Sequence, residues 1–492
     1  MQDYQYKEYG YVKGVAGCIA IVVGLKSCFL GQLIRFGFGT EGIIMGCNLQ
    51  EVMVLIVKEK EPIKPGARVT ATLEPFNMPV GECMRGRVVN PLGEAMDGLD
   101  PIKPEDFIPY FNNAPAIMDR EGLSRTLETG VKLVDTMLPL GRGQRSLVLG
   151  DKMTGKTTIL TDMILNQKGK NIICIYCGIA KNRSQISQVI NLFKEHEAFE
   201  YSTVVYAPAS SSPGQQYLAP YAACSVGEFW MYQGKDVFVV FDDFTKHAWA
   251  YRELSLLMQV PPGRDSYPGD VFYLHSRMIE RAAQLDQKHK GGSMTFIPVV
   301  ELLEGDLTAY VPTNLVSMTD GQIYLSAPLF NEGFRPAIDV GLSVSRVGSK
   351  VQWKAMKDVS KSLRLEFIQY KELLKTSKLQ AGGQSEEARE KLRAGKVLQV
   401  LLTQPPNKPW DMVTQIIVFY AKEANLLKEF EIEKQAKLFV ERVEDYVKEQ
   451  DPGIYKLIRD KKALDDEIKR RIEKVMTPLV KEVIEKTAQE EE

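Results

Sequence analysis

The order of apolar and polar positions divides the chain into three stretches with different patterns. In the first, residues 11–72, short apolar runs are separated by glycine-rich turn signals; the runs are residues 18–23, 32–36, 43–45 and 52–57. Short strands at this spacing are typical of a small all-β barrel. We therefore predict an N-terminal β-barrel domain over residues 1–74.

The second stretch, residues 75–358, alternates apolar runs with longer mixed segments. The runs are residues 147–149, 172–175, 203–206, 237–241 and 295–300. Continuous apolar runs of this kind indicate parallel strands that are buried on both faces. The pattern predicts a central α/β domain.

The third stretch, residues 359–492, places apolar residues at helical spacing among Glu and Lys, as in residues 426–448. This pattern predicts a C-terminal α-helical domain, and its charges are those of solvated helix faces rather than of a nucleic-acid-binding tail. The fold class is thus multidomain: barrel, α/β domain and helical domain in chain order.

A glycine-rich segment joins the first apolar run of the α/β stretch to a helix-compatible segment. It fits the pattern G-x-x-x-x-G-K-[ST] with the residues Gly150, Asp151, Lys152, Met153, Thr154, Gly155, Lys156 and Thr157. A strand, a glycine loop and a helix in this order can turn successive backbone N–H groups toward a polyphosphate. Lys156 would add positive charge near the terminal phosphates, and Thr157 would offer its hydroxyl to Mg²⁺. The motif predicts binding of ATP or ADP with Mg²⁺.

A second polar signal follows the apolar run at residues 237–241, which ends in Asp242 and Asp243. A carboxylate at the end of a hydrophobic strand is what phosphate-loop proteins use to hold Mg²⁺, directly or through water. We therefore expect Asp242 on the metal side of the site, together with Thr157.

Composition limits the other function classes. The 492 residues carry a formal net charge of −1, which offers no general attraction to nucleic acid or an acidic membrane surface. Seven scattered cysteines suit a reducing compartment, and Cys174 and Cys177 lie inside a strand-like run and are expected to be buried thiols. We find no targeting segment, and the apolar stretch at residues 12–34 is too interrupted for a membrane helix.

Several segments resemble the RecA-like rotary ATPases. They are residues 141–145 (GRGQR), 250–252 (AYR), 261–264 (PPGR) and 267–277, and residues 335–349 (RPAIDVGLSVSRVGS) are the most specific. The last segment resembles the α subunits of F-type ATP synthases rather than the catalytic β subunits, and the resemblance extends over nearly the whole chain.

This resemblance implies a ring of three α and three β subunits around a central-stalk γ subunit, with a peripheral-stalk δ-type subunit and no nucleic acid. It implies that the chain is a peripheral protein at the cytoplasmic face of the inner (plasma) membrane, which it would meet only through the membrane sector of a proton- or sodium-coupled complex. The α-type site would bind Mg-nucleotide without turning it over. By this resemblance Phe330, Arg335, Pro336 and Gln404 lie at the adenine side, while Arg346 is the arginine finger for the neighbouring β site and Ser343 is a nearby residue implicated in activity.

Hydrolysis at the chain's own loop would need a carboxylate to polarise the attacking water. The catalytic β family has a glutamate after the strand that follows the phosphate-loop helix, and the α family has a glutamine. This chain has Lys181 there. We therefore expect a site that binds nucleotide and barely hydrolyses it.

The chain departs from the family in other places. Met153 replaces a polar residue, and Gln404 is followed by Pro405 and Pro406, so only one of two family glutamines carries over. The loop at residues 380–387, expected to face the rotor, is rich in glycine. The N-terminus leaves little room for the family's leading helix, which predicts a reduced peripheral-stalk contact.

Two other assignments remain open from the sequence. A homohexameric export-type ATPase shares the core but would need a catalytic carboxylate near Lys181. A Rho-like nucleic-acid translocase would need a basic and aromatic platform in the N-terminal barrel.

Overall fold

The computed structural model describes residues 7–379, 386–430 and 433–489. The chain forms two compact units, each assembled from separated segments. The first contains residues 1–122, 143–149 and 168–319, and the second contains residues 123–142, 150–167 and 320–492.

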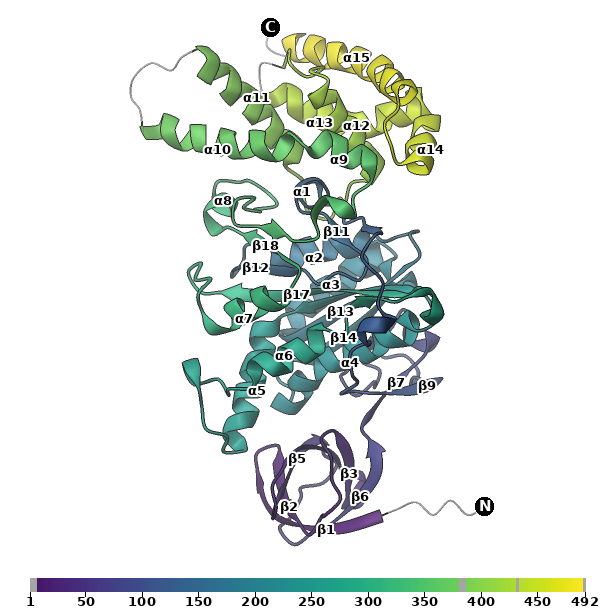
Figure 1. Cartoon of the computed structure of the whole chain (residues 1–492), viewed down its shortest axis with the longest axis vertical. Helices are drawn as coiled ribbons and strands as arrows, with labels where there is room; N and C mark the ends of the chain where they lie inside the picture. The colour runs from purple at the N-terminus through teal and green to yellow at the C-terminus, as the bar shows by residue number, and fades with distance from the viewer. Residues whose placement is uncertain (1–6, 380–385, 431–432, 490–492) are drawn as a thin grey trace. The chain divides into compact units, whose positions relative to one another are not determined.

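The first unit begins with a closed six-stranded barrel in the order β1-β2-β5-β4-β3-β6 (Figure 1). The strands are β1 (Lys7–Ala16), β2 (Ile19–Val23), β3 (Gln32–Phe36), β4 (Glu41–Cys47), β5 (Val52–Lys58) and β6 (Arg68–Pro75). Inward-facing aliphatic side chains such as Val22, Ile34 and Val54 fill its interior. Strand β1 starts at Lys7, ahead of the apolar pattern at residues 11–72, and pairs there with Thr72 of β6.

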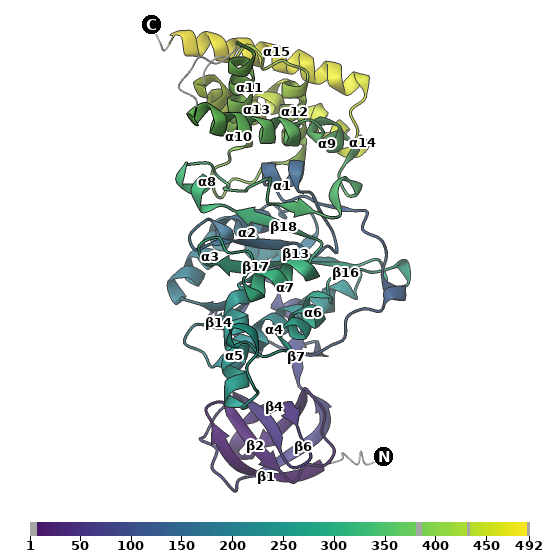
Figure 2. The same cartoon turned by 60° about the vertical axis from the view of Figure 1, so that its left-hand side comes forward.

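The first unit also holds the buried sheet, of which β13, β14 and β17 are labelled in Figure 2. In it β12, β17, β15, β13, β14 and β8 are neighbours in that order. Their bounds are β8 (Val88–Val89), β12 (Leu147–Asp151), β13 (Ile172–Lys181), β14 (Ser202–Pro208), β15 (Asp236–Asp242) and β17 (Ser293–Leu302). The pairs β17–β15, β15–β13 and β13–β14 are parallel, as the continuous apolar runs predicted. Cys174 and Cys177 are buried thiols in β13, also as predicted.

Helices connect the strands of this sheet, and a short antiparallel strand and a two-stranded ribbon lie beside it. The helices are α3 (Arg183–Glu195), α4 (Pro213–Met231), α5 (Phe244–Leu257), α6 (Val271–Ile279) and α7 (Tyr310–Met318). The short strand β16 (Ala283–Gln284) pairs with β17, and β7 (Asn77–Val80) pairs with β9 (Asp106–Pro109). Parallel strands joined through helices leave their carboxyl ends at one edge of the sheet.

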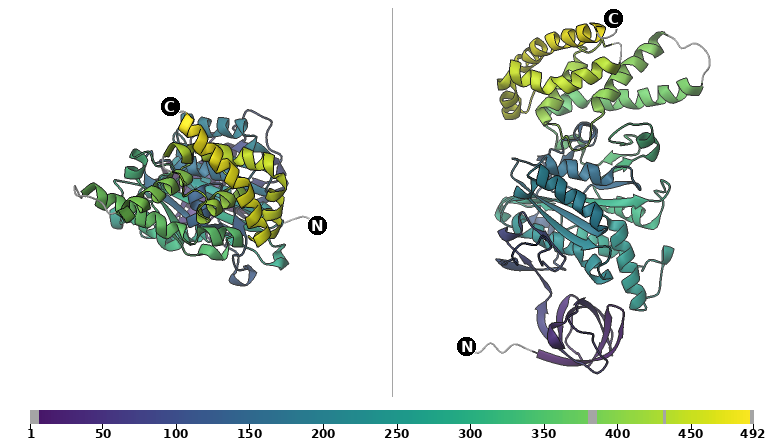
Figure 3. Two further views of the ribbon diagram at one scale, coloured as in Figure 1. Left: turned by 90° about the horizontal axis from the view of Figure 1, so that it is seen from above. Right: turned by 180° about the vertical axis from the view of Figure 1, so that it is seen from behind.

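The second unit combines a nucleotide-loop region with a helical region. Its first part holds β10 (Thr126–Leu127), α1 (Lys132–Met137), β11 (Leu140–Gly141), α2 (Lys156–Leu165), β18 (Gly321–Leu325), α8 (Ala327–Asn331) and β19 (Val344–Ser345). The helical part, seen from two sides in Figure 3, comprises α9 (Lys354–Ser360), α10 (Leu363–Leu379), α11 (Glu386–Leu402), α12 (Met412–Glu423), α13 (Glu433–Gln450), α14 (Pro452–Lys461) and α15 (Asp466–Gln489). Here α10 packs on α11, α11 on α13, and α13 on α15.

The barrel, the α/β sheet and the C-terminal helices confirm the predicted fold class. Within the described ranges, no helix is both long enough and apolar enough to cross a bilayer. Most of the predicted rotor-facing loop, residues 380–385, lies outside the described residues, as do residues 1–6.

Candidate functional site

The phosphate loop in the second unit has the backbone geometry that its glycines predicted. Gly155 has φ +92° and is the N-cap of α2, and such a left-handed conformation favours glycine. Gly150 is needed for a different reason: a Cβ there would lie 2.6 Å from the carbonyl oxygen of Leu325. Both glycines are thus required by their surroundings in the folded loop.

Lys156 is the buried cation of this loop. Its Nζ donates to the carbonyl oxygen of Gly150 at 2.9 Å and to that of Asp151 at 2.5 Å. The Thr154 hydroxyl also donates to Asp151 O, at 2.8 Å. Met153, with φ +64°, is 82% exposed and contributes nothing to the interior of the loop. The loop is therefore closed by its own hydrogen bonds, with Lys156 at the start of α2.

Three residues expected at the adenine side lie together in the second unit. The Arg335 guanidinium carbon is 4.7 Å from the centroid of the Phe330 ring, and the peptide before Pro336 is cis. A Cβ on Gly155 would lie 4.0 Å from the Phe330 ring. The predicted base-side residues therefore stand beside the phosphate loop.

Gln404 belongs to the same region, but its amide is engaged within the chain. Its Nε2 donates to the carbonyl oxygens of Gly130 (2.9 Å) and Lys408 (2.8 Å), while its Oε1 accepts from Lys132 N (3.1 Å). Its backbone N–H donates to Arg335 O at 2.8 Å. Gln404 therefore links the Arg335 segment to residues 130–132 and Lys408.

Asp242 lies in the first unit, at the end of β15, and it is paired with Lys181. The Lys181 Nζ is 2.5 Å from Asp242 Oδ1 and 3.5 Å from Asp243 Oδ2, and the Tyr176 hydroxyl donates to Asp242 Oδ2 at 2.9 Å. The side chains of Asp242 and Lys181 are 1% and 15% exposed. Burial alone would lower the pKa of Lys181, but the two carboxylates outweigh burial and raise it, so Lys181 stays an ammonium.

The backbone explains how Lys181 reaches this position. Gly178 of β13 pairs with Asp242 of β15, so the two strands end side by side. The register with β14 then shifts between Ile179 and Lys181, where Ala180 has φ +50°. A bulge of this kind re-aims the following side chain. Chain order placed these residues far apart, and the ends of adjacent parallel strands bring them together.

The oxygens around Asp242 do not fit the expected Mg²⁺ well. Asp242 meets Lys181 and Tyr176, and Asp243 caps α5 by accepting from Lys246 N at 2.9 Å. No group of three or more His, Cys, Asp or Glu side chains suited to a metal occurs among the residues that the structure describes. The neighbourhood of Asp242 therefore already contains a cation that belongs to the chain.

Ser343 and Arg346, both in the second unit, have contrasting environments. Ser343 is buried; its hydroxyl donates to Asp339 O at 2.6 Å and accepts from Tyr324 N at 2.9 Å. Arg346 is exposed, and its backbone N–H donates to Asp320 O. Within residues 7–379, 386–430 and 433–489, its guanidinium has no hydrogen-bond or ion-pair partner.

The phosphate loop predicted from the sequence is present, and the residues predicted for the base side lie together, but the pairing of Lys181 with Asp242 was not foreseen. The available signal was that both residues lie at the carboxyl ends of predicted parallel strands. Nor was it foreseen that the polar groups of Gln404 and Ser343 are occupied inside the chain.

A parallel sheet combined with a phosphate loop defines a nucleotide-binding protein of the phosphate-loop class. Residues 130–345 match the model of the nucleotide-binding domain of the ATP synthase alpha/beta family, and residues 352–479 match that of the family's C-terminal domain. Proteins named ATP synthase subunit alpha are similar over most of their length. The one from Clostridium botulinum strain Alaska E43 is 43% identical over 464 residues, covering 94% of this chain and 92% of the relative, and that of Clostridium acetobutylicum is 44% identical over 467 residues, covering 95% and 92%. The protein belongs to the family of ATP synthase alpha subunits, which confirms the resemblance seen in its motifs.

Proposed function

We propose that this chain is the nucleotide-binding, non-catalytic member of an alternating ring with β-type subunits, and that it completes their sites with Arg346. The observation that carries the proposal is the pairing of Lys181 with Asp242 and Asp243. A protonated lysine cannot accept a proton from an attacking water, and its charge holds both carboxylates. ATP or ADP would then be bound at residues 150–157 without rapid hydrolysis.

Arg346 suits a role in a neighbouring site. A guanidinium presents several donors in a planar fork that can engage γ-phosphate oxygens as charge develops on them. Arg346 is exposed, with no side-chain partner among the described residues, so no contact within the chain would have to break before it reached a second subunit.

Ser343 and Gln404 support these sites indirectly in this proposal. Ser343 fixes the turn that precedes Arg346, because its hydroxyl joins Asp339 O to Tyr324 N. Gln404 fixes Arg335 beside Phe330. We therefore assign both as positioning residues, and keep Thr157 and Asp242 as the residues proposed on the metal side.

The family places such subunits in an ion-translocating ATP synthase. We extend this to β-type partners, a γ-type central stalk, a δ-type peripheral-stalk subunit and a peripheral position at the cytoplasmic face of the membrane. The similarity to the clostridial proteins favours this assembly over the export-type ATPase and the Rho-like translocase, because those relatives carry the name of the alpha subunit.

The test is hydrolysis and nucleotide binding by the full chain alone and after reconstitution with β- and γ-type subunits. We expect the chain alone to bind ATP but to turn it over far more slowly than the reconstituted complex. K156A in this chain should abolish binding to the isolated chain while leaving most of the turnover of the complex. Brisk turnover by the isolated chain that K156A abolishes would contradict the proposal, as would self-assembly into an active hexamer.

A further inference from the structure

The chain carries its own cation at the carboxylates where its family is expected to use Mg²⁺. We propose that the Lys181 ammonium takes the place of a divalent cation beside Asp242, so that these carboxylates hold no Mg²⁺ and ATP binding by the chain does not require it. The inference rests on the proposed function, because it takes the chain to bind nucleotide and Asp242 to be the carboxylate that the family is expected to use for Mg²⁺.

The oxygens of Asp242 and Asp243 already have partners within the chain. Asp242 Oδ1 lies 2.5 Å from Lys181 Nζ, and Oδ2 accepts from the Tyr176 hydroxyl at 2.9 Å. Asp243 Oδ2 lies 3.5 Å from the same Nζ, and its Oδ1 accepts from Lys246 N at 2.9 Å. Each oxygen of the pair thus already faces the Lys181 ammonium or a hydrogen-bond donor of the first unit. A metal ion or its bound water would have to bind beside these groups.

The charge of Lys181 also disfavours a divalent ion beside these carboxylates. Two buried carboxylates need a counter-charge, and Lys181 supplies it from 15% exposure. A divalent ion entering beside Lys181 would be repelled by the ammonium and would find the carboxylates already partly neutralised.

Hydrogen bonds hold the Lys181 backbone in place. Its carbonyl oxygen accepts from the Tyr206 hydroxyl at 2.9 Å and from Ala209 N at 3.1 Å. Both bonds follow the bulge at Ala180, and they anchor the residue at the end of β13. Lys181 is therefore a built part of this strand end rather than a surface lysine that happens to lie nearby.

The experiment is ATP binding to the full chain, measured by titration calorimetry in excess Mg²⁺ and in EDTA. The wild-type chain should bind ATP with dissociation constants that agree within about threefold in the two conditions. K181Q should bind at least tenfold more weakly in EDTA than in Mg²⁺, because it lacks the internal cation. K181R should behave as the wild type, and K156A should lose binding in both conditions.

Since K181Q leaves two buried carboxylates without their counter-charge, the double variant K181Q/D243N provides a second measurement with less repulsion. It should also depend on Mg²⁺. A wild-type chain that depends on Mg²⁺ as strongly as these variants overturns the inference but leaves the proposed function standing. Failure of the folded wild-type chain to bind ATP in either condition would instead overturn the proposed function.

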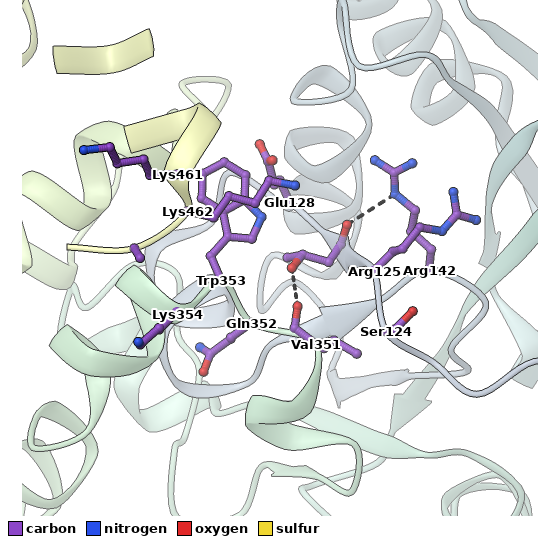
Figure 4. A pocket seen from close by; sticks show the side chains of 12 residues that line it. Ser124, Arg125, Glu128, Arg142, Val351, Gln352, Trp353, Lys354, Lys461 and Lys462 are labelled. Carbon is purple, nitrogen blue, oxygen red and sulfur yellow. Dashed lines mark hydrogen bonds between the residues drawn. The ribbon is translucent and has the colours of Figure 1, made fainter. Parts of the chain in front are cut away.

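A second inference rests on a different observation, a basic cavity of about 520 Å³ in the second unit (Figure 4). We infer that it binds a compact anion with two or more phosphate groups. Five cationic side chains and one acidic side chain line it: Arg125, Arg142, Lys354, Lys461, Lys462 and Glu128.

The cations come from two walls. On one wall Arg142 N donates to Arg125 O at 2.8 Å, and Arg142 Nε donates to Thr126 O at 3.3 Å. On the other, Lys462 follows α14 with φ +51°, its Nζ 5.4 Å from the Trp353 ring centroid. Figure 4 shows the two arginines together and Lys462 across from them, near Glu128 and Trp353. The Lys461 side chain points away from the arginines, and its Nζ lies 2.6 Å from an Asp465 carboxylate oxygen. Positive charge on opposite walls suits a ligand with separated anionic groups, such as linked phosphates.

The probe is pyrophosphate, titrated into the full chain carrying K156A so that the phosphate loop does not compete. We expect one pyrophosphate per chain, with affinity reduced at least fivefold by K462Q or by R142Q. The matched control is K474Q, which removes an exposed lysine outside the cavity and should change nothing. If pyrophosphate does not bind, the inference is overturned. It is also overturned if K462Q, R142Q and K474Q all bind pyrophosphate alike, because the bound molecule is then an adventitious ion only.

Discussion

At the scale of single residues, two side chains that the motif places close together, Ser343 and Arg346, have different environments. Ser343 and Arg346 are three positions apart, yet the Ser343 hydroxyl is buried between Asp339 O and Tyr324 N, while Arg346 is exposed. A buried, doubly bonded hydroxyl stabilises a turn, whereas an exposed guanidinium can reach a neighbour. This difference in exposure and hydrogen bonding supports the proposed roles, with Ser343 as a positioning residue and Arg346 as the residue that reaches a neighbour.

We predict that S343A destabilises the chain more than it slows the complex. Loss of the hydroxyl leaves the buried Tyr324 N–H without its acceptor, which costs about 1–3 kcal/mol of unfolding free energy. Denaturant unfolding of the isolated chain measures this loss. Removal of a donor that touches the reacting atoms typically costs about a hundredfold or more in kcat. A kcat loss of that size in a folded S343A complex, with stability unchanged, would contradict the positioning role.

At the scale of elements, α2 is attached to the segment that carries Gln404. Asp162, near the end of α2, accepts from Asn407 N at 2.8 Å, and Asn407 follows Gln404 by three residues. The phosphate-loop helix and the residues that hold Arg335 are thus linked by a buried carboxylate. Burial raises the pKa of Asp162 to about 7, despite the hydrogen bond from Asn407.

This shift predicts a pH dependence of stability. The native state keeps the Asp162 proton up to about pH 7, whereas the unfolded chain loses it near pH 4, so the unfolded state binds fewer protons between these values. The contribution of Asp162 to stability is therefore fully present below about pH 4 and declines as pH rises to about 7.

The variant D162N should remove this decline, because an amide oxygen can still accept from Asn407 N. We expect D162N to match the wild type near pH 4 and to exceed it above pH 7 by a few kcal/mol at most. Thermal unfolding of both chains across this pH range measures the difference. D460N, which removes the carboxylate of an exposed residue, is the matched control. If the stability of D162N and of the wild type depended on pH in the same way, the prediction would be contradicted.

At the scale of the whole molecule, each of the two compact units is assembled from segments that are separated in the sequence. Residues 150–167, which hold the phosphate loop, group with residues 320–492, whereas Asp242 belongs to the unit that contains the barrel and most of the sheet. The predicted domain limits after residues 74 and 358 remain predictions. In the proposed function, activity at this scale depends on the assembly, because Arg346 would act at the site of another subunit.

We predict that R346A and R346K in the reconstituted complex lower ATP hydrolysis by about a thousandfold or more, as expected for an arginine that stabilises transition-state charge in trans. Lysine should not rescue, because it lacks the planar fork of donors. Steady-state hydrolysis of the complex is the measurement. ATP binding and thermal unfolding of the isolated chain should be unchanged, and a large loss of either would point to a structural role for Arg346.

The sequence alone determined the features that depend on local order. Residues 150–157 were found because glycines at fixed spacing, a preceding apolar run and a following helix are all written within a few residues. The parallel strands were found because burial on both faces leaves a continuous apolar run. The family was recognisable for the same reason, since residues 335–349 form one uninterrupted motif.

Only the tertiary structure decided what the polar side chains meet. The Lys181 Nζ lies 2.5 Å from Asp242 Oδ1 because β13 and β15 pair in parallel and a bulge at Ala180 redirects the lysine side chain. Gln404 and Ser343 use their polar groups inside the chain for a similar reason: residues distant in sequence provide the donors and acceptors. A hydrogen bond depends on atomic positions to within a few tenths of an ångström, and those are set by strand register and packing rather than by the order of residue types.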